Sequence, residues 1–233
     1  MVASKAATGV DANASLRLRP DDADPGYASR GGHKLAGALA AFPGISVAGK
    51  RCLDAGASTG GFTDVLLRAG AARVIAVDVG YGQLAWALRS DPRVEIHDRT
   101  NVRTLSAAQI GGPVDLTVAD LSFISLPIVL PALTACTAPD GIILPMVKPQ
   151  FEVGRERLGS GGVVRDPADR GAAVLRVARA AAELGWPARG VVRSPLPGPA
   201  GNVEFFLWLR RGEPAGMPDD EIMTAVITEG GDG

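Results

Sequence analysis

The feature that most constrains the fold of this chain is a regular alternation of short apolar runs with longer amphipathic segments. Such alternation predicts strands and helices in turn, as in a parallel sheet covered by helices on both faces. The last two apolar runs follow each other without a helix between them, which predicts one antiparallel strand. We therefore predict an α/β fold around a seven-stranded, mostly parallel sheet. The predicted strands are 51–55, 73–79, 93–97, 114–120, 141–147, 188–194 and 202–210, and the predicted helices are 32–42, 61–69, 82–90, 126–136 and 167–184.

The same pattern divides the chain of 233 residues into three parts. Residues 1–28 are polar and include Asp-Asp-Ala-Asp-Pro-Gly at 21–26, which is typical of a linker. Residues 29–211 hold all the predicted elements and form one domain of ordinary size. Residues 212–233 carry six acidic and no basic side chains, so we predict a loose acidic tail. The net charge of −1 is therefore the sum of two parts: residues 1–211 hold 24 basic and 19 acidic side chains, and this tail holds the other six acidic ones.

Composition excludes several classes of protein. No apolar run approaches the roughly 20 residues that a membrane span needs, and the N-terminal residues lack the continuous apolar segment of a secretory signal. Cys52 and Cys136 lie in apolar stretches, as reduced core thiols of a cytoplasmic protein do. Together with His33 and His97, which are far apart, they cannot assemble a zinc site at the usual spacings. We predict a cytoplasmic protein without a metal or a membrane partner.

A glycine-rich segment, Cys52-Leu-Asp-Ala-Gly-Ala-Ser-Thr-Gly-Gly-Phe-Thr63, joins the first predicted strand to the helix at 61–69. Glycines let the backbone turn tightly beside a helix N-terminus and approach a ligand. The dinucleotide fingerprint Gly-x-Gly-x-x-Gly fails because Ser58 replaces its middle glycine. A nucleophile elbow, Gly-x-Ser-x-Gly, matches literally, but it requires a histidine later in the chain, and none follows His97.

The third interpretation of this turn is a binding site for S-adenosylmethionine. Asp54 precedes the glycines, where a carboxylate can meet the amino group of the cofactor. Asp78 ends the next strand roughly 20 residues after the turn, where sheets of this topology present an acid to a ribose diol. An ordinary turn with a helix-capping aspartate is the alternative. The residues predicted to bind the cofactor are Asp54, Gly56, Ala57, Ser58, Thr59, Gly60, Gly61, Phe62, Asp78, Val79, Asn101 and Asp120.

Cationic side chains in this chain are mostly arginine, since only Lys5, Lys34, Lys50 and Lys148 are lysines among 24 basic residues. Lysine can lose its proton when its surroundings lower its pKa, whereas arginine effectively cannot. Lys148 ends a predicted buried strand, within the segment Pro-Met-Val-Lys-Pro-Gln-Phe-Glu at 145–152. We therefore treat Lys148, and less strongly Lys34, as candidates for function; chance placement is the alternative.

Three charged residues are expected at one edge of the sheet. Asp120 ends the strand at 114–120 and Lys148 ends the next, and adjacent parallel strands deliver both to the edge where α/β sheets bind ligands. Glu204 lies near the start of the final strand, which reaches the same edge if it runs antiparallel. A carboxylate inside Val-Glu-Phe-Phe-Leu is costly without a partner, and Lys148 and Lys34 are the available cations. A solvent-facing Glu204 is the alternative.

Five motifs together resemble one protein family. They are Ser29-Arg-Gly-Gly-His-Lys34, Asp54-Ala-Gly-Ala-Ser-Thr-Gly-Gly-Phe-Thr63, Asp78-Val-Gly-Tyr-Gly-Gln-Leu84, Ala119-Asp-Leu-Ser-Phe-Ile-Ser125 and Val147-Lys-Pro-Gln-Phe-Glu152. Over about residues 29–211 they are similar to the TlyA (hemolysin A) family of ribosomal RNA 2′-O-methyltransferases, whose catalytic domain is FtsJ-like. The resemblance implies a Rossmann-like class I S-adenosylmethionine-dependent methyltransferase fold. It also implies a catalytic tetrad, which would here be Lys34, Asp120, Lys148 and Glu204.

The resemblance further implies cytidine 2′-hydroxyls of 16S and 23S ribosomal RNA as substrates and ribosomal subunits as partners. Members of this family begin with an S4-type RNA-binding domain, and residues 2–24 resemble only the end of that domain and its linker. The S4 domain is therefore expected to be largely missing, which concerns RNA affinity rather than methyl transfer.

A ribose hydroxyl needs a base, or a partner that stabilises its developing charge, and Lys148 is our candidate for that group. No metal is required. The residues predicted to contact RNA are Arg30, His33, Phe123, Phe151 and Arg155, with Lys50, Arg51, Arg99, Arg103 and Arg157 as further basic flanks. A solvated face and core aromatic residues are the alternative. The rival functions are a small-molecule O-methyltransferase, a membrane-active hemolysin and a catalytically idle RNA-binding factor.

Overall fold

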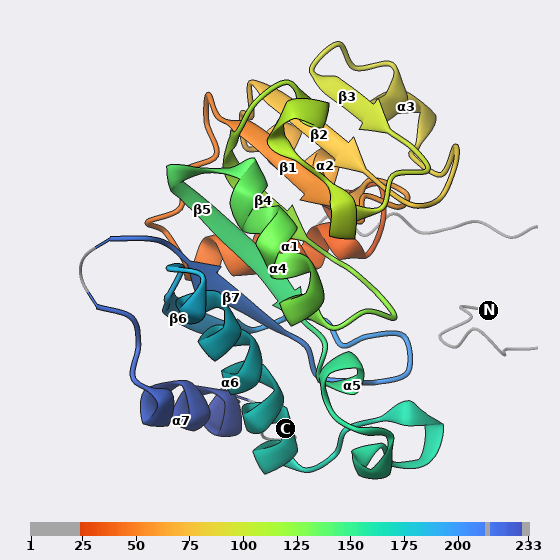
Figure 1. The fold of residues 1–233 in the computed structure, drawn as a ribbon. Helices are drawn as coiled ribbons and strands as arrows, with labels where there is room; N and C mark the ends of the chain where they lie inside the picture. The colour runs from red at the N-terminus through yellow and green to blue at the C-terminus, as the bar shows by residue number, and fades with distance from the viewer. Residues whose placement is uncertain (1–23, 213–214, 230–233) are drawn as a thin grey trace, which may run out of the picture.

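In the part of the chain that the computed structural model describes, residues 24–212 and 215–229, seven strands form one sheet in the order β3-β2-β1-β4-β5-β7-β6 (Figure 1). β7 is antiparallel to both of its neighbours, and the other pairs are parallel. The predicted sheet with one antiparallel strand is therefore confirmed. The strands are β1 (Arg51–Ala55), β2 (Arg73–Val77), β3 (Val94–His97), β4 (Val114–Ala119), β5 (Thr137–Val147), β6 (Ala188–Arg193) and β7 (Phe205–Leu209).

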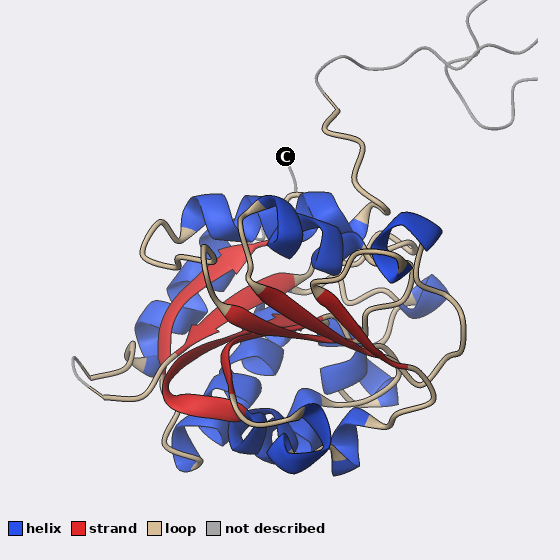
Figure 2. Ribbon diagram, turned by 90° about the horizontal axis from the view of Figure 1, so that it is seen from above, coloured by secondary structure: helices blue, strands red, loops and turns tan. Residues whose placement is uncertain are grey.

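Helices cover both faces of the sheet, as the view from above shows (Figure 2). Buried side chains of α1, α2 and the short α3 pack against one face, and those of α4, α6 and α7 pack against the other. The helices are α1 (Gly31–Ala41), α2 (Gly61–Arg68), α3 (Trp86–Arg89), α4 (Leu126–Cys136), α5 (Pro149–Glu152), α6 (Pro167–Glu183) and α7 (Asp219–Glu229), with short 3₁₀ helices η1 (Val102–Thr104), η2 (Ala107–Ile110), η3 (Arg155–Arg157) and η4 (Ser160–Gly162).

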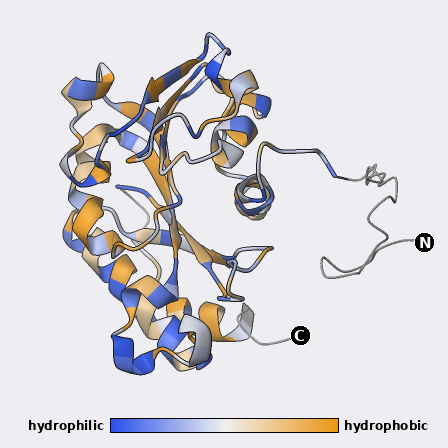
Figure 3. Cartoon of the chain, turned by 90° about the vertical axis from the view of Figure 1, so that its right-hand side faces the viewer, coloured by the Kyte–Doolittle hydropathy of each residue, from blue (hydrophilic) through white to orange (hydrophobic). Residues whose placement is uncertain are grey.

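Strand residues point alternately into the two helix layers. In β1, Leu53 and Ala55 belong to the core beneath α4 and α6, whereas Cys52 belongs to the core beneath α1 and α2. Cys52 and Cys136 are both buried free thiols, as predicted. Because the sheet is covered on both faces, its strands appear in the sequence as continuous apolar runs, and Figure 3 shows them as hydrophobic ribbons between the two layers.

The helix predicted at 82–90 is wrong in length, because only Trp86–Arg89 is helical. Two carboxylates hold the residues before it in a loop. Asp78 accepts the backbone N–H of Gly80 at 2.7 Å, and Asp98 accepts that of Gly82 at 3.1 Å. Such side-chain contacts offer the backbone an alternative to helical hydrogen bonds. The loop therefore stays beside the edge of the sheet where β2 ends.

The prediction of a loose acidic tail is also wrong, because Asp219–Glu229 forms α7. Ile222 and Val226 lie one helical turn apart and are buried against α6 and β6. Three of the six acidic residues of this segment, Asp219, Asp220 and Glu221, lie in the first turn of α7, where carboxylates interact favourably with the helix dipole. The prediction relied on the acidic composition and overlooked Ile222 and Val226, two apolar residues at helical spacing.

The final strand begins later than predicted, at Phe205, so that Glu204 lies just before β7. Val147 at the end of β5 pairs with Phe205 at the start of β7. Lys148 and Glu204, the residues adjacent to this pair, therefore leave the sheet at the same edge, as predicted. Most of the predicted linker at 1–28 lies outside the described residues, which begin at Asp24.

Candidate functional site

The candidate site lies at the edge of the sheet where β1, β2, β4 and β5 end and β7 begins. The turn after β1 is held close to the neighbouring strands, since the backbone N–H groups of Gly56 and Ala57 both donate to the carbonyl of Val77. A Cβ atom on Gly56 would lie 2.6 Å from the carbonyl oxygen of Asp120, so only glycine fits at this position. The glycine-rich turn therefore allows the end of β4 to approach the end of β1.

Ser58 adopts a left-handed backbone conformation with φ of 47°, which costs energy for a residue with a side chain. Its backbone N–H donates to Asp78 Oδ2 at 2.8 Å, and Asp78 Oδ1 accepts from Gly80. The carboxylate of Asp78 thus fixes both the turn after β1 and the loop after β2. Each carboxylate oxygen keeps a further acceptor site, so Asp78 can still receive a hydroxyl from a ligand.

Two adjoining cavities open at this edge of the sheet. The first has a volume of about 400 Å³ and is called here the Asp78 cavity. Six residues predicted to bind the cofactor line it: Gly56, Ser58, Asp78, Val79, Asn101 and Asp120. The loop from Leu121 to Ile124 forms much of its remaining wall. Its volume lies within the range of small-molecule binding sites.

The second cavity, called here the Lys148 cavity, has a volume of about 270 Å³ and is lined by all four residues of the predicted tetrad. It shares Gly56, Ser58, Asp120 and Ser122 with the Asp78 cavity. The predicted cofactor residues Ala57, Gly61 and Phe62 also line it. The two cavities therefore share one wall, and Asp120 of the predicted tetrad is part of it.

The four tetrad residues form two ion pairs. Lys148 Nζ lies 2.6 Å from Asp120 Oδ1 and donates a hydrogen bond to Ser122 Oγ at 2.9 Å. Lys34 Nζ, from α1, donates to Glu204 Oε2 at 2.6 Å, and both of these side chains are buried. The alternative of a solvent-facing Glu204 is thereby excluded. Residues that are up to 170 positions apart in the sequence thus meet in one cavity.

Asp54 lies beneath the turn and lines neither cavity. Its side chain is fully buried, Oδ2 accepts a hydrogen bond from Thr63 Oγ1 at 2.7 Å, and Oδ1 has no partner. Burial raises the pKa of this carboxyl group to about 7, the hydrogen bond from Thr63 opposes the increase, and the nearby charges of Asp120 and Asp78 add to it. Thr59 and Gly60, also predicted to bind the cofactor, likewise line neither cavity.

The residues present fit S-adenosylmethionine. The Asp78 cavity offers an acidic acceptor for a ribose and an apolar wall around Val79 and Val102 for a base. At the Lys148 cavity, a Cβ on Gly61 would lie 2.7 Å from the backbone nitrogen of Gly32 and 2.3 Å from Ser29 Oγ. The first turns of α1 and α2 are therefore in close contact there, and their N-terminal ends favour a carboxylate.

Among the residues predicted to contact RNA, two line the cavities, and a third, Phe151, contacts one of these two. Arg30 is exposed and lines the Lys148 cavity, and Phe123 lines the Asp78 cavity with 90% of its surface exposed. Phe123 also has a positive φ of 63°, which is unusual for an aromatic residue. Its ring lies 5.2 Å from that of Phe151, measured between centroids, and Lys148 Nζ lies 6.0 Å from the Phe151 ring.

Other predicted RNA contacts have partners within the protein. His33 Nε2 lies 3.2 Å from Asp24 Oδ1, and its ring contacts Tyr27 edge-on. Arg99 stacks on Tyr81 at 4.4 Å, and Arg157 pairs with Asp169 at 2.8 Å. The side chains of Arg103 and Arg155 are exposed.

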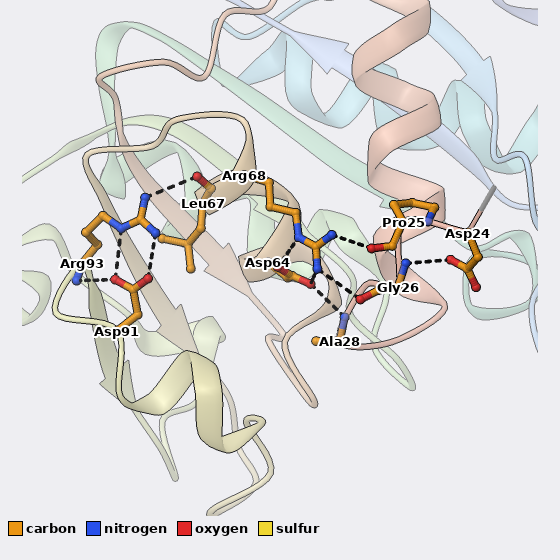
Figure 4. A network of polar contacts seen from close by, with 9 residues as sticks. All are labelled: Asp24, Pro25, Gly26, Ala28, Asp64, Leu67, Arg68, Asp91 and Arg93. Carbon is orange, nitrogen blue, oxygen red and sulfur yellow. Dashed lines mark hydrogen bonds and ion pairs between the residues drawn. The ribbon is translucent and has the colours of Figure 1, made fainter. Parts of the chain in front are cut away.

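The segment that contains Asp24 is fastened to α2 through one arginine (Figure 4). Arg68 donates to the carbonyls of Pro25 and Gly26 and pairs with Asp64, which in turn accepts the backbone N–H of Ala28 at 2.9 Å. This network fixes the segment that leads into α1, the helix that carries Lys34. Figure 4 also shows the separate Asp91–Arg93 pair, which anchors the turn before β3 to Leu67 of α2.

Lys50 and Arg51 do not flank the site, contrary to our prediction. Arg51 begins β1, whereas the cavities lie at the opposite end of this strand. Its guanidinium donates to the carbonyls of Ile110, Gly112 and Pro113. Arg51 therefore stabilises the loop before β4. The basic residues at 50–51 were misleading because they lie at the start of β1, whereas the cavities lie at its end.

Sequence reasoning missed two polar residues of the site. Ser122 accepts the hydrogen bond from Lys148, and Gln150 Nε2 lies 3.5 Å from Glu204 Oε1. Ser122 follows Asp120 by two positions, and Gln150 follows Lys148 by two positions. This closeness in sequence to a predicted tetrad residue was the signal that could have identified them. Among the described residues, no helix is long and apolar enough to cross a membrane, and no group of three or more potential metal ligands was found.

The chain is similar to proteins of one family over most of its length. Residues 27–211 match the FtsJ-like methyltransferase family. The 16S/23S rRNA (cytidine-2′-O)-methyltransferase TlyA of Mycobacterium tuberculosis H37Rv is 62% identical over 89% of this chain and 77% of that protein. The putative rRNA methyltransferase YqxC of Bacillus subtilis is 45% identical over 86% of this chain and 73% of that protein. The structure of a putative hemolysin from Streptococcus thermophilus superposes with a TM-score of 0.83 at 38% identity, covering 93% of this chain and 76% of the other. The chain belongs to the FtsJ-like methyltransferase family and, within it, to the TlyA group.

Proposed function

We propose that this protein transfers a methyl group from S-adenosylmethionine to the ribose 2′-hydroxyl of cytidine in 16S and 23S ribosomal RNA. The observation that carries the proposal is the pairing of the two cavities. One is lined by Asp78 and has the features of a nucleoside site, and the other holds two lysine–carboxylate pairs at the shared wall. The substrate class, cytidine in 16S and 23S ribosomal RNA, comes from the names of the TlyA relatives. A cytoplasmic location follows for an enzyme of ribosomal RNA.

S-adenosylmethionine would supply an electrophilic methyl group. The protein must therefore hold the ribose hydroxyl in line with that group and manage the proton that leaves the oxygen. Lys148 is the proposed group for the second task, because its Nζ atom lies at the cavity that adjoins the Asp78 cavity. It acts as the base or as the cation that stabilises negative charge on the oxygen.

The two carboxylates of the tetrad act as positioning groups in this proposal. Asp120 and Ser122 fix Lys148 Nζ from one side. Glu204 holds Lys34 at the other side of the cavity, where the ammonium group of Lys34 can face the ribose or a neighbouring phosphate. Because both pairs are assembled before any substrate enters, little reorganisation is needed during the reaction.

RNA binding would use the exposed residues around the two cavities. Arg30, which lines the Lys148 cavity, carries a charge that suits a phosphate, and Phe123 presents an exposed ring that suits a base. Arg155, which is exposed but lines neither cavity, is proposed as a further phosphate contact. The ring of Phe151 contacts that of Phe123 and supports it. His33 is the weakest of the proposed RNA contacts, because its Nε2 atom lies 3.2 Å from Asp24 Oδ1 and must leave this partner to reach RNA.

The test is transfer of tritiated methyl groups to isolated ribosomal subunits, followed by mapping of the modified nucleotides. We expect the wild-type protein to label ribosomal RNA at a cytidine ribose. Lys148→Met should lower the rate at least 100-fold, in line with the usual contribution of a group that handles a proton. Lys50→Met is the matched control, because Lys50 lies at the opposite end of β1 from the site. Labelling of a base, or full activity of Lys148→Met, would contradict the proposal.

A further inference from the structure

The buried carboxylate of Glu152 is not used by the chemistry described above, yet it contacts the end of the loop that follows β4 and lines the Asp78 cavity. Its side chain is only 1% exposed. Oε1 accepts the backbone N–H of Leu126 at 2.7 Å, and Oε2 accepts from Ser125 Oγ and from Arg176 Nη2, each at 2.7 Å. A buried carboxylate with this many donors is held in one position.

The contact with Leu126 lies at the first turn of α4. Ser125 is the N-cap residue of this helix, but its side chain makes no capping hydrogen bond and donates instead to Glu152. Glu152, from another segment, therefore supplies the acceptor that an N-terminal turn requires, and its negative charge faces the positive end of the helix. The position where α4 begins is thus set by a residue 26 positions later in the sequence.

The residues before α4 form the loop Asp120–Ser125, which lines the Asp78 cavity. The segment Lys148–Glu152 contacts this loop at its beginning, middle and end. Lys148 contacts Asp120 and Ser122, Phe151 contacts Phe123, and Glu152 contacts Ser125.

The middle of the loop contains the strained residue Phe123, whose positive φ persists only where the surroundings impose it. Both ends of the loop must therefore be fixed. Lys148 fixes the first end, but it is also the proposed reacting group. Glu152 fixes the other end without taking part in the chemistry.

We infer that Glu152 is a positioning residue, which holds the loop Asp120–Ser125 in the conformation that binds S-adenosylmethionine and places Asp120 against Lys148. Without its carboxylate, Ser125 and the N-terminus of α4 lose their acceptor, and the loop can leave the wall shared by the two cavities. The inference rests on the proposed function for its effect on turnover. Its effect on cofactor binding is independent of the RNA substrate.

The test compares three variants. Glu152→Gln keeps the size of the side chain but replaces one acceptor oxygen with a donor, and we expect at least a tenfold weaker affinity for S-adenosylhomocysteine by calorimetry and a lower kcat. Arg176→Met removes the exposed partner on α6 and leaves the contacts with Ser125 and Leu126, so affinity should change less than threefold. Glu183→Gln, at an exposed glutamate of α6, is the matched control and should behave as wild type.

All measurements are made at least 15 °C below the Tm of each variant, so that a loss of folding is separated from a loss of position. If Glu152→Gln does not fold, Ser125→Ala takes its place, with the same pattern expected at a smaller amplitude. Wild-type affinity and kcat in a folded Glu152→Gln protein, or an equal loss in Arg176→Met, would overturn the inference. Absence of RNA methylation by the wild-type protein would refute the proposed function, while the calorimetric result would still decide the role of Glu152.

Discussion

Replacing Asp54 with asparagine removes a buried carboxyl group whose ionisation is opposed by the fold. Asp54 is fully buried, only one of its oxygens has a partner, and its pKa is raised to about 7. In the unfolded chain the same group has a pKa near 3.8. Between these two values the folded protein binds a proton that the unfolded chain does not bind, so the free energy of unfolding falls as the pH rises through this window.

The size of the effect follows from the difference between the two pKa values. Each pH unit between about 4 and 7 costs about 1.4 kcal/mol, so the full difference of about 3 units corresponds to about 4 kcal/mol. Between pH 5 and pH 8 the part lost is about 3 kcal/mol. Asp54→Asn cannot ionise, and its amide oxygen can still accept from Thr63. The wild type should therefore lose about 3 kcal/mol relative to this variant over that range.

The assay is urea unfolding of both proteins at pH 5, 6, 7 and 8. Taking the difference between the two proteins at each pH cancels the titration of every other group that the substitution leaves unchanged. Asp140→Asn, at an exposed aspartate, is the control, and its difference from wild type should not vary with pH. Parallel stability curves for wild type and Asp54→Asn would refute the reasoning, because they would show that Asp54 has the same pKa in both states.

Two further predictions concern α7 and the RNA surface. Val226→Ala should lower the free energy of unfolding by about 2 kcal/mol, because Val226 is fully buried against α6. Denaturant titration measures this change. The control is Thr228→Ala, on the exposed side of α7, which should stay within about 0.5 kcal/mol of wild type. Arg155→Gln should weaken RNA binding at low salt and reduce the slope of log K against log salt by about 1, with Arg179→Gln, on α6 and paired with Asp219, as the control. An unchanged slope would remove Arg155 from the RNA surface.

The amino-acid sequence was sufficient to predict the architecture and the edge of the sheet where the four charged residues meet. Buried parallel strands require continuous apolar runs, so their positions could be predicted before the sheet was seen. Asp120 and Lys148 end adjacent parallel strands, and this topology alone brings them to one edge. The glycine turn with Asp78 indicated the nucleoside-binding half of the site by the same logic.

The sequence was least informative where a local pattern competes with a distant contact. Carboxylates of Asp78 and Asp98 hold Gly80 and Gly82 in a loop at the start of the helix expected at 82–90, and an acidic segment packs against α6 as α7. Lys50 and Arg51 belong to a basic stretch of the sequence, but β1 carries that stretch to the wrong end of the sheet.

Only the tertiary structure decided which charges pair and how the site is supported. Sequence reasoning offered Lys34 and Lys148 as partners for Glu204 without choosing between them. The fold pairs Glu204 with Lys34 and leaves Asp120 to Lys148. It also showed that Glu152 caps a helix 26 residues before it. A sequence pattern reports the period and length of local elements, whereas these contacts depend on where each side chain is placed by packing between distant segments, which no local pattern records.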